Sequence, residues 1–340
     1  MPAVLALSGS WAGAGETRFV DLYSAEVAVA SRAADERREA AALALQTVYN
    51  RITGSANAVA EFPQLASGLA RAELMVSGYQ YQQHESPEPA PQLILQFSFE
   101  QSAVRSALAR AGAPWWAANR PLAEVWLVVQ RGSSRDFVTR NKHPQLYDAL
   151  LGEASRAGVP LSLPIEQGDG RLSRARAWQQ DDADILQALS RGSADVALVG
   201  RVAEDNGSWQ GQWKIYSKGD LRVARIQAES AEAVAAAGLR PLAASLARRF
   251  AVRDSAASLA QRYQLSINGL RDQRDYLAMM GELEGIDGLS DLQLLEVDGQ
   301  RCEFTFSFNG SADRARALLG LNSRLVHAGA GDELLFSWRP

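Results

Sequence analysis

The densest cluster of basic and aromatic side chains lies between residues 171 and 178, where Arg171, Arg174 and Arg176 precede Trp178. Guanidinium groups bind phosphates and carboxylates through paired hydrogen bonds, and an indole ring adds a stacking surface. These four side chains could therefore bind a phosphate, an acidic peptide or a glycan. A solvated loop that binds nothing is the alternative, and it is the interpretation that we favour.

Two adjacent tryptophans, Trp115 and Trp116, follow Pro114 between two stretches that read as separate modules. Two neighbouring indoles could anchor a glycan or a protein partner, because tryptophan combines a large apolar area with a polar N–H group. They could also close the junction between two modules as a buried plug. We favour the plug.

An acidic run, Asp181, Asp182 and Asp184, could bind a hard cation through its carboxylates. The same run stands at the start of a predicted helix, where carboxylates cap free N–H groups and complement the helix dipole. We therefore expect a capping role rather than a metal site.

The single cysteine, Cys302, alternates with three phenylalanines along a predicted strand, which indicates a buried, unreactive thiol. The three histidines, His84, His143 and His327, are widely spaced and are expected at the surface or in loops. Phosphate-binding loops, strand-anchored glycine-rich nucleotide motifs, nucleophile elbows and zinc-binding histidine pairs are missing from the sequence. The sequence thus predicts no catalytic residue, no cofactor and no metal site.

The composition is that of a folded protein with more than one domain. The chain has 340 residues, of which 47% are hydrophobic and 22% are charged, and this length predicts two or three domains. Its 35 Lys and Arg residues against 39 Asp and Glu residues give a net charge of −4. This balance argues against a protein that binds nucleic acid.

The first fifteen residues contain a short apolar stretch and the small residues Ala12, Gly13 and Ala14, which resemble a signal-peptidase site. No Lys or Arg precedes Arg18, so the stretch is either a chance apolar tail or the end of a secretory signal that starts upstream. We expect the second, and with it a periplasmic protein. A run of about 18 apolar residues is absent elsewhere, so we expect no transmembrane segment.

The elements behind these candidates predict a mixed α/β and α+β fold made of three small modules. Residues 16–121 read as a βαββα sandwich, with an alternating strand over residues 93–99 and a helix over residues 35–53. Residues 122–250 read as a βαβαβ-type α/β sandwich with an antiparallel extension, because apolar strands at 123–129 and 194–200 alternate with helices. Residues 251–340 follow the βαββαβ order of the ferredoxin-like plan.

A family resemblance is carried by segments that occur in a fixed order. They are Val20–Val27, Val48–Gly54, Asn119–Leu127, Gly158–Pro164 and Ala194–Arg201, with Trp209 to Trp213 following. Over about residues 18–250 they resemble the proteobacterial family called domain of unknown function 2066. The resemblance implies an exported, envelope-associated protein, and it brings no known activity or functional residues with it.

These observations favour a non-catalytic periplasmic scaffold that binds a protein partner in the cell envelope; they leave its oligomeric state open. The alternative is a small-ligand-binding protein or an enzyme. Its site would lie at the carboxyl ends of the strands in the middle module, near Arg131, Glu166 and Arg201.

Overall fold

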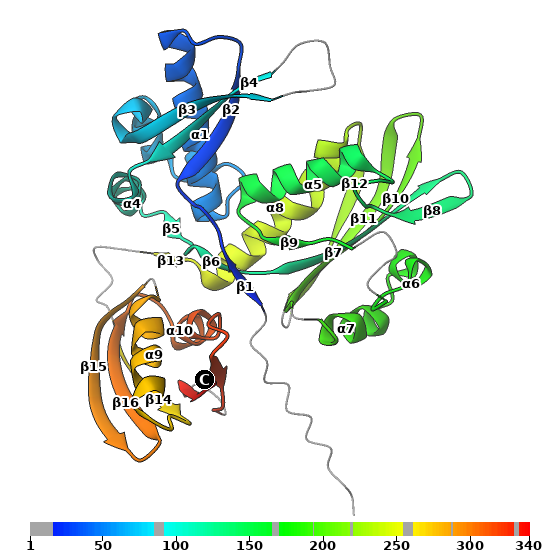
Figure 1. Cartoon of the computed structure of the whole chain (residues 1–340). Coiled ribbons are helices and arrows are strands. Elements are labelled where there is room, and N and C mark those ends of the chain that lie inside the picture. The colour runs from blue at the N-terminus through cyan, green and yellow to red at the C-terminus, as the bar shows by residue number, and fades with distance from the viewer. Residues whose placement is uncertain are drawn as a thin grey trace, which may run out of the picture. The chain divides into compact units, whose positions relative to one another are not determined.

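A computed structural model describes residues 16–84, 92–164, 170–192, 194–217, 220–253, 261–286, 288–329 and 333–340 (Figure 1). One compact unit holds residues 16–259 and a second holds residues 260–340. The apolar stretch over residues 1–15, on which the signal-peptide expectation falls, lies outside the described residues.

The N-terminal lobe of the larger unit packs helix α1 (Ala34–Thr53) against a three-stranded antiparallel sheet in the order β2-β4-β3. Leu95, Phe97 and Phe99 of β4 are buried, as the predicted alternation requires. The remaining bounds in this lobe are β2 (Ser24–Val29), α2 (Ala58–Glu61), η1 (Pro63–Leu65), α3 (Ala66–Leu69), η2 (Ala72–Met75), β3 (Val76–His84), β4 (Gln92–Phe99) and α4 (Gln101–Arg110).

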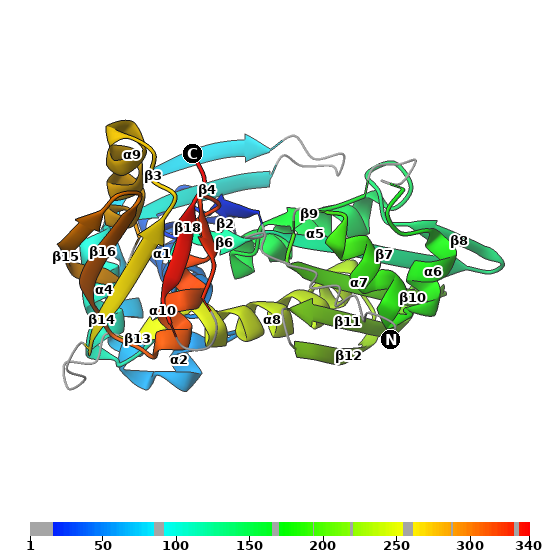
Figure 2. The same cartoon turned by 90° about the horizontal axis from the view of Figure 1, so that it is seen from below.

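The middle lobe is built on a larger sheet with strand order β12-β11-β10-β7-β8, and β9 pairs with β7 (Figures 1 and 2). Strand β7 runs parallel to β10 and β9, whereas the other pairs are antiparallel. Its residues from Ala123 to Val129 are all buried, as predicted for a strand covered on both faces. The strand bounds are β7 (Ala123–Arg131), β8 (Ser134–Phe137), β9 (Leu161–Ser162), β10 (Val196–Asp205), β11 (Ser208–Ser217) and β12 (Asp220–Ala228).

Helices cover both faces of this sheet. Helices α5 (Pro144–Ala157) and α8 (Ala231–Phe250) pack together on one face, where the Trp213 indole N–H donates a 2.9 Å hydrogen bond to the carbonyl oxygen of Val234. Helices α6 (Arg174–Gln179) and α7 (Asp182–Ser190) cover the other face above Trp126 and Val199. The predicted α/β sandwich with an antiparallel extension is therefore confirmed.

Short ladders that the sequence analysis did not predict lie where the two lobes meet. Strand β1 (Thr17–Phe19) pairs antiparallel with β6 (Asn119–Pro121), and β5 (Pro114–Trp115) pairs antiparallel with β13 (Val252–Arg253). Helix α1 also contacts α5. The boundary between residues 121 and 122 remains a prediction.

The C-terminal unit has the predicted βαββαβ order with one addition. Its strands lie in the order β15-β16-β14-β18-β17, whose first four members repeat the ferredoxin-like arrangement. The additional strand is β17, which leaves β18 to run parallel to β14 instead of antiparallel. The bounds are β14 (Gln261–Asn268), α9 (Gln273–Glu284), β15 (Leu289–Asp298), β16 (Arg301–Phe308), α10 (Ala312–Leu319), β17 (Leu325–His327) and β18 (Leu335–Trp338).

Candidate functional site

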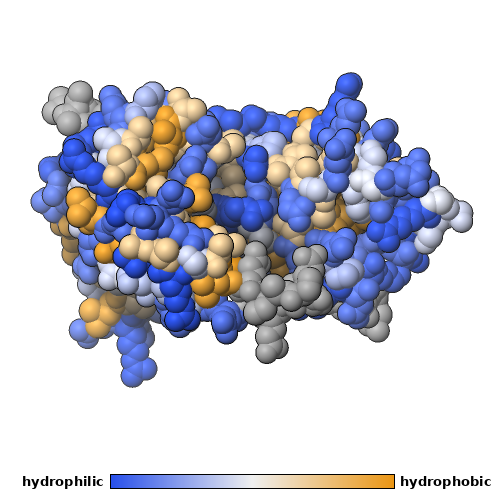
Figure 3. All heavy atoms as spheres, turned by 90° about the horizontal axis from the view of Figure 1, so that it is seen from above, coloured by the Kyte–Doolittle hydropathy of each residue, from blue (hydrophilic) through white to orange (hydrophobic). Residues whose placement is uncertain are grey.

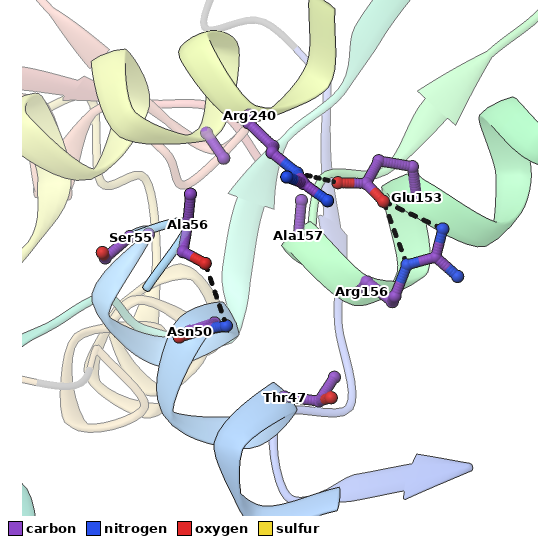
Figure 4. Close-up of a pocket in the computed structure, with 10 residues that line it drawn as sticks. Thr47, Asn50, Ser55, Ala56, Glu153, Arg156, Ala157 and Arg240 are labelled. Atoms are coloured by element: carbon purple, nitrogen blue, oxygen red, sulfur yellow. Dashed lines mark hydrogen bonds and ion pairs between the residues drawn. The ribbon is translucent and has the colours of Figure 1, made fainter. Parts of the chain in front are cut away.

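A polar pocket of about 80 Å³ opens where the end of α1 meets α5 and α8 (Figure 4). Ligand pockets for drug-sized molecules are roughly 300–1,000 Å³, so this one has room for water or a small anion only. The lining residues are Thr47, Asn50, Gly54, Ser55 and Ala56 from α1 and its C-terminal turn, Glu153, Arg156 and Ala157 from α5, and Arg240 and Ala243 from α8.

The wall formed by α1 is fixed by a glycine and an asparagine. Helix α1 ends at Gly54, whose φ of +68° favours glycine, and a Cβ at this position would lie 2.2 Å from the Cβ of Ala247. The Asn50 side chain donates to the carbonyl oxygen of Ala56 at 3.2 Å and accepts from the N–H of Ala58 at 2.8 Å. These contacts hold the turn after α1 in place against α8.

The charged wall of the pocket is one buried carboxylate between two arginines. Glu153, whose side chain is 5% exposed, accepts from Arg156 Nη2 at 2.9 Å and from Arg240 Nε at 2.8 Å. Both arginine side chains are about half exposed, which leaves this group a net charge of +1 at the pocket mouth. The arrangement links α5 to α8 and could attract a small anion. Among the lining residues that the structure describes there is no histidine or cysteine, and the Ser55 hydroxyl donates to the Glu61 carboxylate.

Each arginine of the cluster predicted from the sequence forms an ion pair with a carboxylate of the same chain. Arg171 lies 2.7 Å from Glu124, Arg174 lies 3.0 Å from Asp136, and Arg176 lies 2.7 Å from Asp184. Trp178 is half-buried beneath the guanidinium of Arg135, which lies 4.2 Å from the centroid of its rings. Because these carboxylates come from β7, β8 and α7, the arginines fasten α6 and the segment before it to the middle lobe.

The tryptophan pair lies inside the larger unit. Trp115 is 5% exposed and Trp116 is fully buried, so neither side chain presents a broad surface to a partner. Each ring has an arginine over it, with Arg105 at 4.4 Å from Trp115 and Arg120 at 3.8 Å from Trp116. This position, next to the β5–β13 ladder, is that of a plug at the junction of the lobes.

The residues of the alternative site do not converge in the described structure. Arg131 forms an ion pair with Glu204, and Arg201 donates to the carbonyl oxygen of Trp178 at 3.2 Å. Glu166 lies outside the described residues.

The capping interpretation of the acidic run is confirmed. The Asp181 side chain accepts from the N–H groups of Ala183 and Asp184 at the start of α7. Asp182 accepts from Lys214 at 2.7 Å and from the Tyr216 hydroxyl at 2.6 Å, and the Lys214 bond in particular lowers its pKa. In the described ranges, no three His, Cys, Asp or Glu side chains are grouped as metal ligands.

The predicted state of Cys302 is also confirmed, because its side chain is buried and burial raises the pKa of its thiol. The prediction that His143 lies at the surface or in a loop is confirmed for the loop. This residue precedes α5 in a loop as expected, but it is only 9% exposed. Within the described part of the chain neither of its ring nitrogens has a hydrogen-bond partner. No local sequence signal distinguishes it from a surface histidine.

Acidification is expected to destabilise the fold through His143. Burial lowers the pKa of its imidazole, and the positive charge of Arg131 adds to that effect. The unfolded chain therefore binds the proton more readily, so that the stability present above pH 7 is lost as the pH falls below about 6.5. We expect a loss of up to about 1 kcal/mol from this group between pH 7.5 and 5.5. Urea unfolding at the two pH values measures the loss, and His143→Phe should remove this share of it. Equal pH dependence in the two proteins would contradict the prediction.

In the portion of the chain that the structure covers, no helix combines the length and apolar character needed to cross a bilayer.

Comparison with known proteins adds one finding. The model of a family described as a domain of unknown function, DUF8605, matches residues 17–117, which run from β1 to just beyond β5. No curated protein and no solved structure matches the chain. Residues 17–117 are therefore similar to a domain of unknown function.

Proposed function

We propose that this chain is a non-catalytic interaction protein of the bacterial envelope that binds a protein partner along the free edge of strand β12. The observation that carries the proposal is this edge. Strand β12 pairs with β11 on one side and with no other described strand. Its Leu221 and Val223 side chains are 45% and 57% exposed.

The position of these two side chains in the sheet explains their exposure. Leu221 pairs with Tyr216 and Val223 with Lys214, on the opposite face to Trp213, which packs under α8. The apolar core beneath α6 and α7 includes Trp126, Val199 and Tyr216 but not the side chains of β12. Leu221 and Val223 thus stay exposed on a face of the outer strand that the core beneath α6 and α7 does not reach.

An unpaired strand edge with apolar side chains is a site where another chain adds a strand. The main-chain N–H and C=O groups provide the binding, and the alternate side chains provide the specificity. Hydrophobic surface is confined to a few patches on the face of the molecule shown in Figure 3, where most of the surface is hydrophilic.

The envelope location rests on sequence. It is supported by the signal-like apolar stretch over residues 1–15 and by the resemblance of residues 18–250 to domain of unknown function 2066. The alternative, a ligand-binding protein or an enzyme, gains less support, because Arg131 and Arg201 are bound to Glu204 and to a backbone carbonyl.

A photo-crosslinking residue at position 223 is expected to give a discrete adduct with another protein chain in living cells. Leu221→Lys should abolish that adduct, because a charge on the apolar face disfavours strand addition. The matched control is the same photo-reactive residue at Gln101, which is exposed at the start of α4 and should give no adduct.

Fractionation of the same cells tests the location, and the crosslinked product should appear in the periplasmic fraction. Absence of an adduct at position 223, or an adduct that survives Leu221→Lys, would contradict binding at β12. A cytoplasmic product would contradict the envelope assignment.

A further inference from the structure

We propose that the β12 edge of one copy of this chain pairs with the β15 edge of a second copy, so that the copies join head to tail. The inference rests on the proposed function and names the partner of the β12 edge. The observation that supports it is a second edge strand, β15, in the other compact unit. Its net charge is opposite to that of β12.

Strand β15 is the outer strand of the C-terminal sheet and pairs with β16 alone among the described strands. It spans ten residues, and β12 spans nine. Leu294, Leu295 and Val297 of β15 are 43%, 51% and 57% exposed. Both edges thus offer exposed apolar side chains beside backbone groups that no other described strand pairs with, and their lengths are similar. The ladder of β15 with β16 shifts register between Ser290 and Gln293 and between Leu294 and Glu296, so pairing would use the segments on either side of these shifts.

The two edges differ in charge. Between Arg274 and Arg301 the sequence has no Lys or Arg, and its acidic residues there are Asp275, Glu282, Glu284, Asp287, Asp291, Glu296 and Asp298. Three of these, Asp291, Glu296 and Asp298, lie exposed on β15 itself, which gives the strand a charge of −3. Strand β12 carries Arg222 and Arg225 against Asp220, a charge of +1.

The difference in charge between β12 and β15 favours one of the three possible pairings of these edges. Two β15 edges would bring six carboxylates together, and two β12 edges would bring like net charges together; like charges on paired strands are destabilising. Only the β12–β15 pair joins apolar side chains to opposite net charges. Such an interface uses two different surfaces of the chain, so each copy offers two binding edges and the copies close into a ring or extend as a filament.

Reversal of the charge on each edge, separately and together, tests the inference. Arg225→Glu changes the charge of β12 from +1 to −1, and Glu296→Lys with Asp298→Lys changes that of β15 from −3 to +1. All three side chains are exposed, so the variants should keep their fold, which circular dichroism confirms. Arg110→Glu, at an exposed position on α4, is the control.

The wild-type chain, followed by sedimentation velocity from low to high micromolar concentration, is expected to form species larger than a monomer, and 1 M salt should weaken them. Each edge variant should weaken association about tenfold or more, and the control should not. The chain with both edges reversed should recover association, because opposite net charges face each other again. Loss of a fold or of an unrelated contact would not be rescued in this way.

A monomeric wild-type chain, association that survives both edge variants, or failure of the doubly reversed chain to recover would each overturn the inference. The proposed function fails separately. If the purified chain is monomeric while position 223 still crosslinks to a different protein in cells, the interaction role stands and the self-assembly does not.

Discussion

An Arg120→Met variant is expected to lose about 3–5 kcal/mol of unfolding free energy. The Arg120 side chain is fully buried and donates hydrogen bonds to five backbone carbonyl groups. Its Nη2 lies 2.8 Å from the carbonyl oxygen of Arg51, and its Nη1 lies 2.8 Å from that of Gly158. Methionine fills similar space but donates to none of these oxygens, and buried carbonyl groups without partners are costly.

The five acceptors belong to three separate segments, which are the end of α1, the end of α5 and the turn between β5 and β6. Burial lowers the pKa of the Arg120 guanidinium well below its usual value, and the positive charge of Arg51 lowers it further. Arg120→Lys should therefore fail to restore stability, because one ammonium has three donors at a single point whereas the guanidinium fork reaches several directions.

Urea unfolding followed by tryptophan fluorescence measures the effect of Arg120→Met. The matched control is Arg110→Met on the exposed end of α4, which should cost less than about 0.5 kcal/mol. A loss below about 1 kcal/mol for Arg120→Met would show that the carbonyl groups find other partners.

A Trp213→Ala variant is expected to lose about 3–5 kcal/mol as well, for a different reason. Trp213 is fully buried between β11 and α8, and its indole N–H is bonded to Val234. A Cβ added at Gly200 or at Gly238 would lie 2.4 Å or 2.8 Å from its ring atoms. Both glycines thus leave room for the ring, and its removal leaves a cavity that this rigid surround cannot fill.

The control for Trp213→Ala is Trp178→Ala, because Trp178 is only half-buried. The same urea titration should give a loss for Trp178→Ala well below that for Trp213→Ala. Equal losses would mean that the cavity at Trp213 closes by movement of α8.

Most of the regular elements follow from patterns within short stretches of sequence. The alternation over residues 93–99 predicts β4, and the apolar run from Ala123 predicts a strand covered on both faces. Both patterns are local, because a strand repeats every two residues and a buried strand is apolar throughout. The predicted start of α7 at Asp182 is correct for a similar reason, since the cap at Asp181 lies next to the helix that it starts.

The contacts where the lobes meet could not be predicted in this way. Strands β1, β5, β6 and β13 have two or three residues each, too few for a period, and each pairs with a segment about 100 or more positions away. Arg120 carries no sign of burial, because its partners are backbone carbonyl groups, which every residue has. The ion pair between Glu153 and Arg240 likewise joins helices that are 87 residues apart.

The arginine cluster shows the same limit for a site. Its composition fits both a ligand patch and a solvated loop, whereas the structure gives a third state. Each arginine is bound to a carboxylate of this chain, and the pairs Arg171–Glu124 and Arg174–Asp136 join residues about 40 positions or more apart. Strand β17 was not predicted, because it has only three residues. In the sequence it lies within the segment that connects α10 to β18.

The ladder between β1 and β6 closes the N-terminal lobe on itself. Thr17 pairs with Pro121, so the chain enters and leaves this lobe at neighbouring backbone positions. A segment whose two ends meet can be removed from a gene, or transplanted into another, as a cassette, because a short link rejoins the remaining chain.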